Sequence, residues 1–124
     1  MILGFKPQFP EPIKKGIKKH TIREDKHNRW KAGHIIHMAT GVRTKLYNCF
    51  YKCKCTGTQK IEISVDNDKL MGQIICVYID SKLLYHSDVE TLAKNDGFDS
   101  AKDFFAWFNK DFSGKIIHWT DLRY

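Results

Sequence analysis

The sequence predicts an α+β domain dominated by strands, a mixed β-barrel of five to seven strands with a short N-terminal helix and a helix pair before the last strand. Short runs of β-branched and aromatic residues recur along the chain, whereas helical patterns are few and mostly late. Small, strongly curved sheets tend to close into barrels, which removes their exposed edges. A chain of 124 residues suffices for one core, so we expect residues 1–124 to form a single domain.

The first forty residues contain four expected elements. Three are strands, indicated by the runs "ILGF", "HTIRE" and "HIIHMA". The fourth is a short helix in "PEPIKKG", where Pro12 suits the first turn and Gly16 the exit. Further along, "KLYNCFYKCKCTGTQKIEISV" is broken at Gly57, which predicts two strands or one bent long strand. The run "QIICVYI" predicts another strand.

The helix pair is expected in the last third of the chain. Ser87 followed by Glu90 has the pattern of a capping box, and Gly97 stands where a left-handed residue would end the first helix. The second helix should begin at Asp99 or Ser100. Its apolar residues recur with a helical period and are expected to be core: Ala101, Phe104, Phe105, Phe108 and Phe112. The run "GKIIHW" predicts the last strand.

The formal net charge of +7 hides an asymmetry between the halves of the chain. Residues 1–60 carry fourteen Lys or Arg and three Asp or Glu, a charge of +11, whereas residues 61–124 carry seven and eleven, a charge of −4. Crowded like charges destabilise a fold through self-repulsion, and a polyanionic partner is the usual reason for tolerating them. The basic half therefore favours RNA, another nucleic acid or a nucleotide as the partner.

The longest apolar run after the start is "IICVYI", six residues, which is too short for a signal core or a membrane span. We therefore expect a cytoplasmic protein that does not enter a membrane. Its cysteines should then be free thiols: Cys49, Cys53, Cys55 and Cys76. They lack the paired spacing of a zinc site, and His34 and His37 would face opposite sides of a strand. We expect no metal and no cofactor.

The segment "GIKKHTIRED" carries the candidate site, because Lys18, Lys19, Thr21 and Arg23 follow closely on Gly16. A threonine hydroxyl needs a nearby base to become a nucleophile, and a lysine serves where desolvation or neighbouring cations lower its pKa. In a regular strand Lys18 and Thr21 would face opposite sides, so this chemistry requires the chain to turn at residues 18–20. In the alternative, Lys18 is solvated and Thr21 and Arg23 face a ligand groove.

Four further residues are weaker candidates. Arg43 and Lys45, after the turn at Thr40 and Gly41, would hold a phosphate or simply form a solvated hairpin tip. Trp30 is expected to pack on the barrel rim rather than stack on a base. His20, next to Thr21, is a candidate proton carrier.

Several motifs in this order resemble the ASCH domain family, a branch of the PUA-like barrels. They are "GFKPQF", the Gly16-x-Lys18-x-x-Thr21-Ile22-Arg23 string, "RWKAGHII", "TGVR" and "NDGFDSAKDFFAWF", and together they span almost the whole chain. The resemblance implies a PUA-like barrel and RNA or modified-nucleobase recognition. Ribonuclease activity is also attributed to some members.

Some small bacterial ASCH proteins are amidohydrolases that remove the acyl group of N4-acetylcytidine with a Lys, a Thr three residues later and a distant Glu. Lys18 and Thr21 match the first two positions, and Asp96 aligns with the third, one methylene shorter than the usual Glu. In this interpretation Lys18, Thr21 and Asp96 are catalytic, and Lys19, Arg23, Arg43 and Lys45 bind the ligand. The sequence leaves three functions open: a binding module for RNA or a nucleobase-containing ligand, a small amidohydrolase as the alternative, and a ribonuclease as the second alternative, for which no acid and base pair is assigned.

Overall fold

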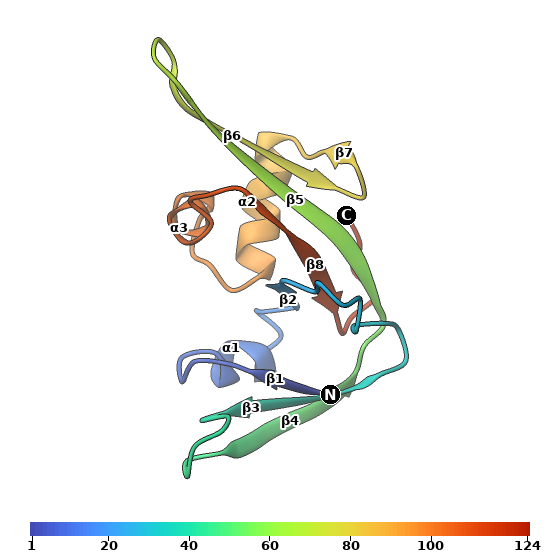
Figure 1. The fold of residues 1–124 in the computed structure, drawn as a ribbon. Coiled ribbons are helices and arrows are strands. Elements are labelled where there is room, and N and C mark those ends of the chain that lie inside the picture. Colours follow the sequence, from blue (N-terminus) through green and yellow to red (C-terminus); the bar gives the residue numbers. More distant parts are fainter.

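The computed structural model describes residues 1–124 as an α+β fold with eight strands in two sheets and three helices (Figure 1). The α+β class and the dominance of strands, expected from the sequence, are confirmed. Hydrogen bonding between the strands defines two separate sheets, whereas the sequence analysis expected a single barrel. The chain passes from one sheet to the other at Cys55 and Thr56, between the two strands that the break at Gly57 predicts.

The small sheet has the strand order β1-β3-β4. Strand β1 (Ile2–Gly4) lies parallel to β3 (Ile35–Thr40), which pairs antiparallel with β4 (Asn48–Lys54). Helix α1 (Pro10–Lys14) covers this sheet and buries Ile13. The core between them consists of Leu3, Phe5, Ile13, Trp30, Ile36, Met38, Cys55 and Ile117, so Trp30 packs as expected.

The large sheet has the order β2-β8-β5-β6-β7, and all its pairs are antiparallel. Its strands are β2 (His20–Arg23), β8 (Phe112–His118), β5 (Gly57–Asp68), β6 (Gly72–Ile79) and β7 (Lys82–Leu83). The two-residue strand β7 is the one that the sequence analysis missed. It was missed because a two-residue strand leaves no periodic pattern in the sequence, and it raises the number of strands from the predicted maximum of seven to eight.

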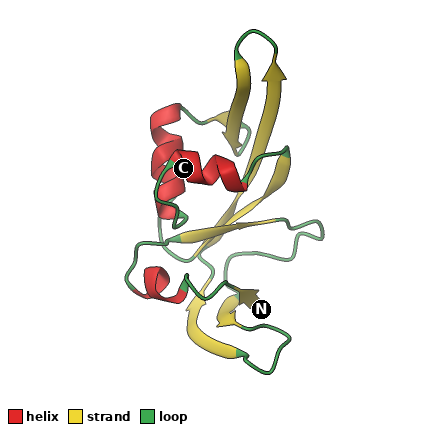
Figure 2. Ribbon diagram, turned by 90° about the vertical axis from the view of Figure 1, so that its left-hand side faces the viewer, coloured by secondary structure: helices red, strands yellow, loops and turns green.

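Two helices cover one face of the large sheet (Figure 2). Helix α2 (His86–Asn95) begins after Tyr85, so Ser87 lies inside the helix and the predicted capping box is wrong. Glu90 instead accepts a hydrogen bond at 2.9 Å from the amide of Ala101, the first residue of α3.

The expected start of the second helix is confirmed. Helix α3 (Ala101–Trp107) is capped by Ser100, whose hydroxyl accepts from the amide of Asp103 at 3.3 Å. The helix ends before Phe112, which opens β8 instead of continuing the helical stripe. Phe104 is fully buried in the core under the large sheet, as the helical period predicts. None of the three helices is long and apolar enough to cross a membrane.

Strand β8 separates the two cores, because successive side chains of a strand point to opposite faces. Ile116 belongs to the core under α2 and α3, and Ile117 belongs to the core under α1. The neighbouring strand β2 shares this position, with Ile22 paired to Ile116 and Thr21 paired to Ile117. The residues of β2 therefore lie at the junction of the two halves, which is where the pocket forms.

Candidate functional site

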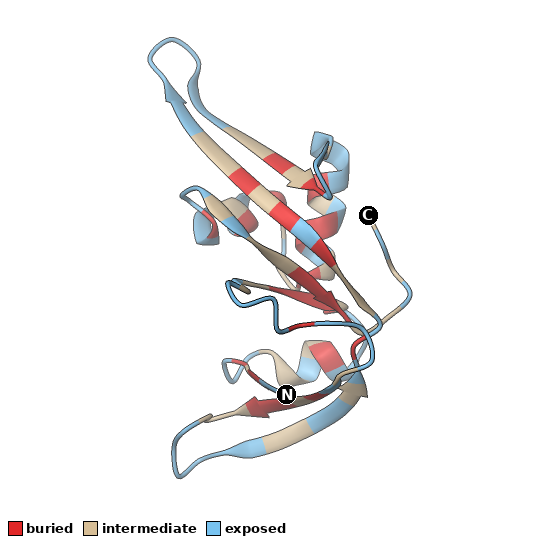
Figure 3. Cartoon of the chain, turned by 45° about the vertical axis from the view of Figure 1, so that its right-hand side comes forward, coloured by how far each residue is buried: buried red, intermediate tan, exposed pale blue.

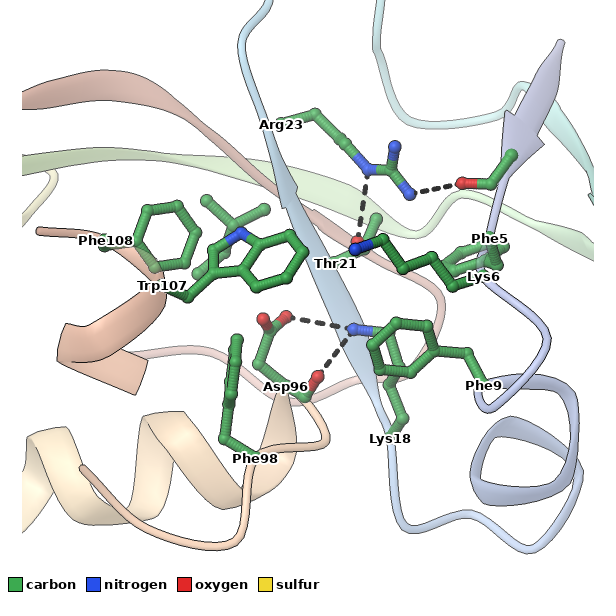
Figure 4. Close-up of a pocket in the computed structure, with 12 residues that line it drawn as sticks. Phe5, Lys6, Phe9, Lys18, Thr21, Arg23, Asp96, Phe98, Trp107 and Phe108 are labelled. Carbon is green, nitrogen blue, oxygen red and sulfur yellow. Dashed lines mark hydrogen bonds and ion pairs between the residues drawn. The ribbon is translucent and has the colours of Figure 1, made fainter. Parts of the chain in front are cut away.

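A pocket of about 210 Å³ opens between the small sheet and the two late helices, with β2 as its floor (Figure 4). Its walls come from β1 and α1 on one side and from the ends of α2 and α3 on the other. The polar lining residues are Lys18, Thr21, Arg23, Asp96 and Lys6. The aromatic ones are Phe5, Phe9, Phe98, Trp107 and Phe108. Four of the seven predicted site residues thus meet in one concavity.

Lys18 reaches the pocket because the chain has not yet entered a strand at that point. Helix α1 ends at Lys14, and Gly16 adopts a left-handed φ of 77° that L side chains rarely adopt. The amide of Lys18 then donates to the carbonyl of Pro12 at 3.1 Å, and β2 begins only at His20. The turn lies slightly earlier than the expected residues 18–20. Because Lys18 is not part of the strand, its side chain is not forced to the face opposite Thr21, and both point into the pocket.

Asp96 directly follows helix α2, and the left-handed turn that ends this helix places its side chain in the pocket. Gly97 has a φ of 97°, and the amide of Phe98 donates back to Ala93 at 2.9 Å, which is a left-handed C-terminal cap. A Cβ atom at Gly97 would lie 3.3 Å from Cδ of Lys18. The left-handed φ therefore favours glycine at position 97, and any larger residue would also press against the Lys18 side chain.

Lys18 and Asp96 form an ion pair that is almost removed from water, with exposed fractions of 3% and 5%. Lys18 Nζ donates to the Asp96 carbonyl oxygen at 2.6 Å and to Oδ1 at 3.3 Å. It also lies 5.1 Å from the centroid of the Phe9 ring. Burial lowers the pKa of Lys18 below its ordinary value, and Asp96 opposes part of that shift.

Arg23 and Thr21 form the other polar edge of the pocket. Arg23 Nη2 donates to the carbonyl of Gly4 at 2.6 Å, and Nε donates to Thr21 Oγ1 at 3.4 Å. The guanidinium also lies 5.2 Å from the centroid of the Phe5 ring. These contacts orient Thr21 and leave its hydroxyl hydrogen free to donate, while Lys18 Nζ is bonded to Asp96 rather than to Thr21.

His20 lies behind the ion pair, on the opposite side of β2 from Thr21. Its Nδ1 donates to Asp96 Oδ1 at 3.0 Å, because a carboxylate oxygen can only accept. The hydroxyl of Tyr124 lies 2.6 Å from His20 Nε2 and accepts from Asn95 Nδ2 at 3.1 Å. This chain of hydrogen bonds holds Asp96 Oδ1 and leaves Oδ2 without a partner in the protein.

A second buried histidine continues this polar layer. His118 is fully buried, and its ring centroid lies 5.3 Å from that of His20. Gln59 fixes the tautomer of His118, because its Oε1 accepts from the Tyr124 amide at 3.0 Å and its Nε2 donates to the Tyr124 carbonyl at 2.9 Å. His118 Nε2 therefore donates to Gln59 Oε1 at 3.0 Å, and Nδ1 has no partner. Burial, with His20 and Arg123 nearby, lowers the pKa of His118 to about 3.

The remaining predicted site residues lie outside the pocket. The Lys19 side chain does not line it, although the Lys19 amide donates to the carbonyl of Asn95 at 2.7 Å. Arg43 and Lys45 are exposed on the hairpin between β3 and β4, where Arg43 has a left-handed φ of 64°. They are not part of this concavity.

Sequence reasoning missed the aromatic lining and Tyr124. Phe108 lines the pocket as well as the core, so the helical stripe is not purely structural. Trp107, which is 56% exposed, stands beside that stripe, and an exposed tryptophan next to a buried face was the available indication. Phe5 and Phe9 come from a different region, and no periodic pattern links them to the late helices.

Comparison of the chain with protein-family models, with curated protein sequences and with solved structures finds no significant match in any of the three.

The Lys18–Asp96 pair predicts a large cost for removing one partner. Asp96→Asn leaves a buried ammonium without its counter-charge, so we expect a loss of about 3–5 kcal/mol in the free energy of unfolding. The double variant Lys18→Met/Asp96→Asn should recover part of that loss in urea denaturation. As a control, Glu11→Gln breaks the exposed Lys15–Glu11 pair and should leave stability nearly unchanged. Equal stability of Asp96→Asn and Lys18→Met/Asp96→Asn would contradict this account.

His118 predicts a loss of stability in mild acid. Its pKa is about 3 in the folded protein and 6.5 in its ordinary state, so between these values the unfolded chain binds one more proton. Stability therefore rises with pH through this window and is lost as the pH falls, by about 1.4 kcal/mol per pH unit. Urea denaturation between pH 6.5 and 5 should show this slope, and His118→Gln should flatten it. If His118→Gln kept the same dependence of stability on pH, groups other than His118 would cause that dependence.

Proposed function

We propose that this chain is an ASCH-type, PUA-like domain that binds a nucleobase-containing ligand in the pocket on β2. One observation carries the proposal: Lys18, Thr21, Arg23 and Asp96 face the same concavity as five aromatic side chains. Aromatic faces stack on bases, and a few fixed polar groups select among them. The ligand is RNA or a modified nucleoside or nucleotide, in keeping with the excess of basic residues in the first half of the chain.

The size of the pocket suits one heteroaromatic ring. A cavity of about 150 Å³ holds a benzene molecule, and this pocket measures about 210 Å³. Trp107 is half-exposed at its edge, with Lys6 Nζ 4.5 Å from the centroid of its ring. A base that enters beside Trp107 would have an indole to stack on and a cation close to any attached phosphate.

The polar groups supply a mixed hydrogen-bonding edge. Asp96 Oδ2 is free to accept an N–H from the ligand, because Lys18 and His20 bond only to Oδ1 and to the main chain. The Thr21 hydroxyl is free to donate to a carbonyl oxygen. A pyrimidine with an amino group near a carbonyl presents the complementary pattern.

The proposal extends to the fold family and the location. We propose that the two sheets belong to a PUA-like barrel and that the protein is cytoplasmic. The motifs of the ASCH resemblance support the first part. The four cysteines, all unpaired, fit the second.

Binding of free nucleosides tests this function. Titration of the protein with cytidine, N4-acetylcytidine and uridine should shift the NMR signal of the Trp107 indole. Because stacking on an aromatic side chain contributes about 1–3 kcal/mol per base, Trp107→Ala should weaken binding about 5- to 150-fold. Trp107→Phe should retain much of the affinity, and Tyr85→Ala, at an exposed ring outside the pocket, should retain all of it. Binding that is equally strong in Trp107→Ala would place the ligand elsewhere.

A second candidate, the amidohydrolase, is favoured by the burial of Lys18 beside Thr21 and Asp96. A lysine whose pKa is lowered by burial can accept the Thr21 hydroxyl proton as the oxygen attacks an acyl carbon. The C–N bond then breaks, the amine leaves with a proton from the lysine, and water hydrolyses the acyl-threonine. Because Lys18 Nζ is bonded to Asp96 and not to Thr21, a substrate must first shift this contact. Binding is therefore the function that the geometry supports better.

Turnover of N4-acetylcytidine separates the two candidates. An amidohydrolase would release cytidine, and Thr21→Ala would abolish release while weakening nucleoside affinity only about fivefold, since it removes one hydrogen bond. Its rate should rise with pH, because only the neutral amine of Lys18 accepts a proton, and the rise should come below the ordinary lysine range. Chromatography of the reaction with native protein and with Thr21→Ala measures this. Release of cytidine by both proteins at one rate would exclude Thr21 as the nucleophile.

A further inference from the structure

The small sheet and its loops form a surface with one sign of charge. Between Asp25 and Glu62 the chain contains no acidic residue and eight Lys or Arg. Two of the eight are neutralised, Lys26 by Glu24 and Lys60 by Glu62. The other six are exposed and form neither an ion pair nor a side-chain hydrogen bond within the protein: Arg29, Lys31, Arg43, Lys45, Lys52 and Lys54. We call these six the cationic face.

The strand register places the middle of the cationic face on the solvent side of the small sheet. Paired residues of neighbouring strands share a face, so Ile2, His37 and Lys52 lie in one row. Ile35 and Lys54 form the next row on the same side. Ile2 and Ile35 are about half-exposed, at 54% and 49%, which identifies this side as the outer one. Figure 3 shows β4 along the edge of this sheet with exposed and intermediate residues.

The remaining cations extend the face at both ends of β4. Arg43 and Lys45 lie in the hairpin that precedes β4, and Arg29 and Lys31 lie in the loop that precedes β3. That loop is next to the far end of β4, because the amide of Gly33 donates to Cys55 at 2.8 Å. The charges therefore follow β4 from one end to the other.

Protection of a sheet edge does not account for this pattern. Lysines on an edge strand prevent sheets from pairing with one another, which would explain Lys52 and Lys54. It does not explain the four cations in the loops. Ordinary solvated surfaces mix both signs, as the large sheet does with the pair of Lys60 and Glu62 at 2.9 Å.

We propose that the cationic face binds the phosphate backbone of a single-stranded nucleic acid. Unpaired cations along one face match a polyanion, and a half-exposed aromatic ring, Tyr47 at 46%, lies in the same hairpin as Arg43 and Lys45. Single-strand binders combine these two features, because cations follow the backbone while an aromatic ring stacks on a base. This surface lies on a different sheet face from the pocket lining, so the proposal does not rest on the nucleoside site.

The test is fluorescence anisotropy with labelled 12-nucleotide oligouridine and oligodeoxythymidine. Affinity should fall as salt rises, because binding releases counterions. Lys52→Ser/Lys54→Ser should weaken binding by more than about tenfold at 50 mM salt and reduce the slope of log affinity against log salt by about 1.4. The matched control Lys69→Ser/Lys82→Ser removes the same charge from two exposed positions, one in the turn between β5 and β6 and one in β7, and should change little.

Three results would overturn the proposal. The first is an equal loss in both double variants, which would mean that only net charge matters. The second is tighter binding to a duplex of the same length than to either single strand. The third is no binding to any oligonucleotide at 50 mM salt, with or without binding to vesicles that contain anionic lipid.

The nucleoside titration keeps this proposal separate from the pocket. Lys52→Ser/Lys54→Ser should bind free cytidine as the native protein does, because neither lysine lines the pocket. Loss of oligonucleotide binding with normal nucleoside binding is the expected result. Normal oligonucleotide binding by a protein that binds no nucleoside would defeat the pocket function and leave the cationic face in place.

Discussion

The buried ion pair of Lys18 and Asp96 is the interaction on which the site depends. Lys18 belongs to the segment that follows α1, and Asp96 follows α2, so the pair joins the two halves of the molecule at their junction. Two charges withdrawn from water require close geometry and additional hydrogen bonds. Both are present, because the Asp96 carbonyl and His20 complete the contacts. The pair thereby fixes the distance between α2 and β2, and the concavity above it follows from that distance.

The residues of the two proposed sites are divided between the two halves of the molecule. The large sheet and its helices supply Asp96 and most of the aromatic rings, on a rigid apolar core. The small sheet and its loops carry the cationic face, and the segments after β1 supply the other wall of the pocket through Phe5 and Phe9. Arg23 connects the halves a second time, because it extends from β2 to the carbonyl of Gly4 in β1. A ligand in the pocket would therefore touch both halves at once.

Much of the fold was predictable from the sequence, since local chemistry determines most of its elements. Seven strands have β-branched or aromatic runs, and Ser100 and Gly97 mark real helix ends. The two-sheet arrangement was not predictable, because strand pairing depends on contacts between residues far apart. For the site, the short "GIKKHTIRED" segment pointed to Lys18, Thr21 and Arg23. The aromatic lining of the pocket was missed, because Phe5 and Trp107 come from opposite ends of the chain and no local pattern connects them.

The position of β8 between two cores also decides how strictly that strand must align. A slip of one residue would exchange Ile116 and Ile117, and isoleucine for isoleucine costs little by itself. The flanking residues prevent the error. Lys115 Nζ would lose Asp25, 3.1 Å away, and His118 would lose Gln59. The polar side chains on either side of the Ile116–Ile117 pair therefore set the alignment of β8, because the two isoleucines alone would accept either alignment.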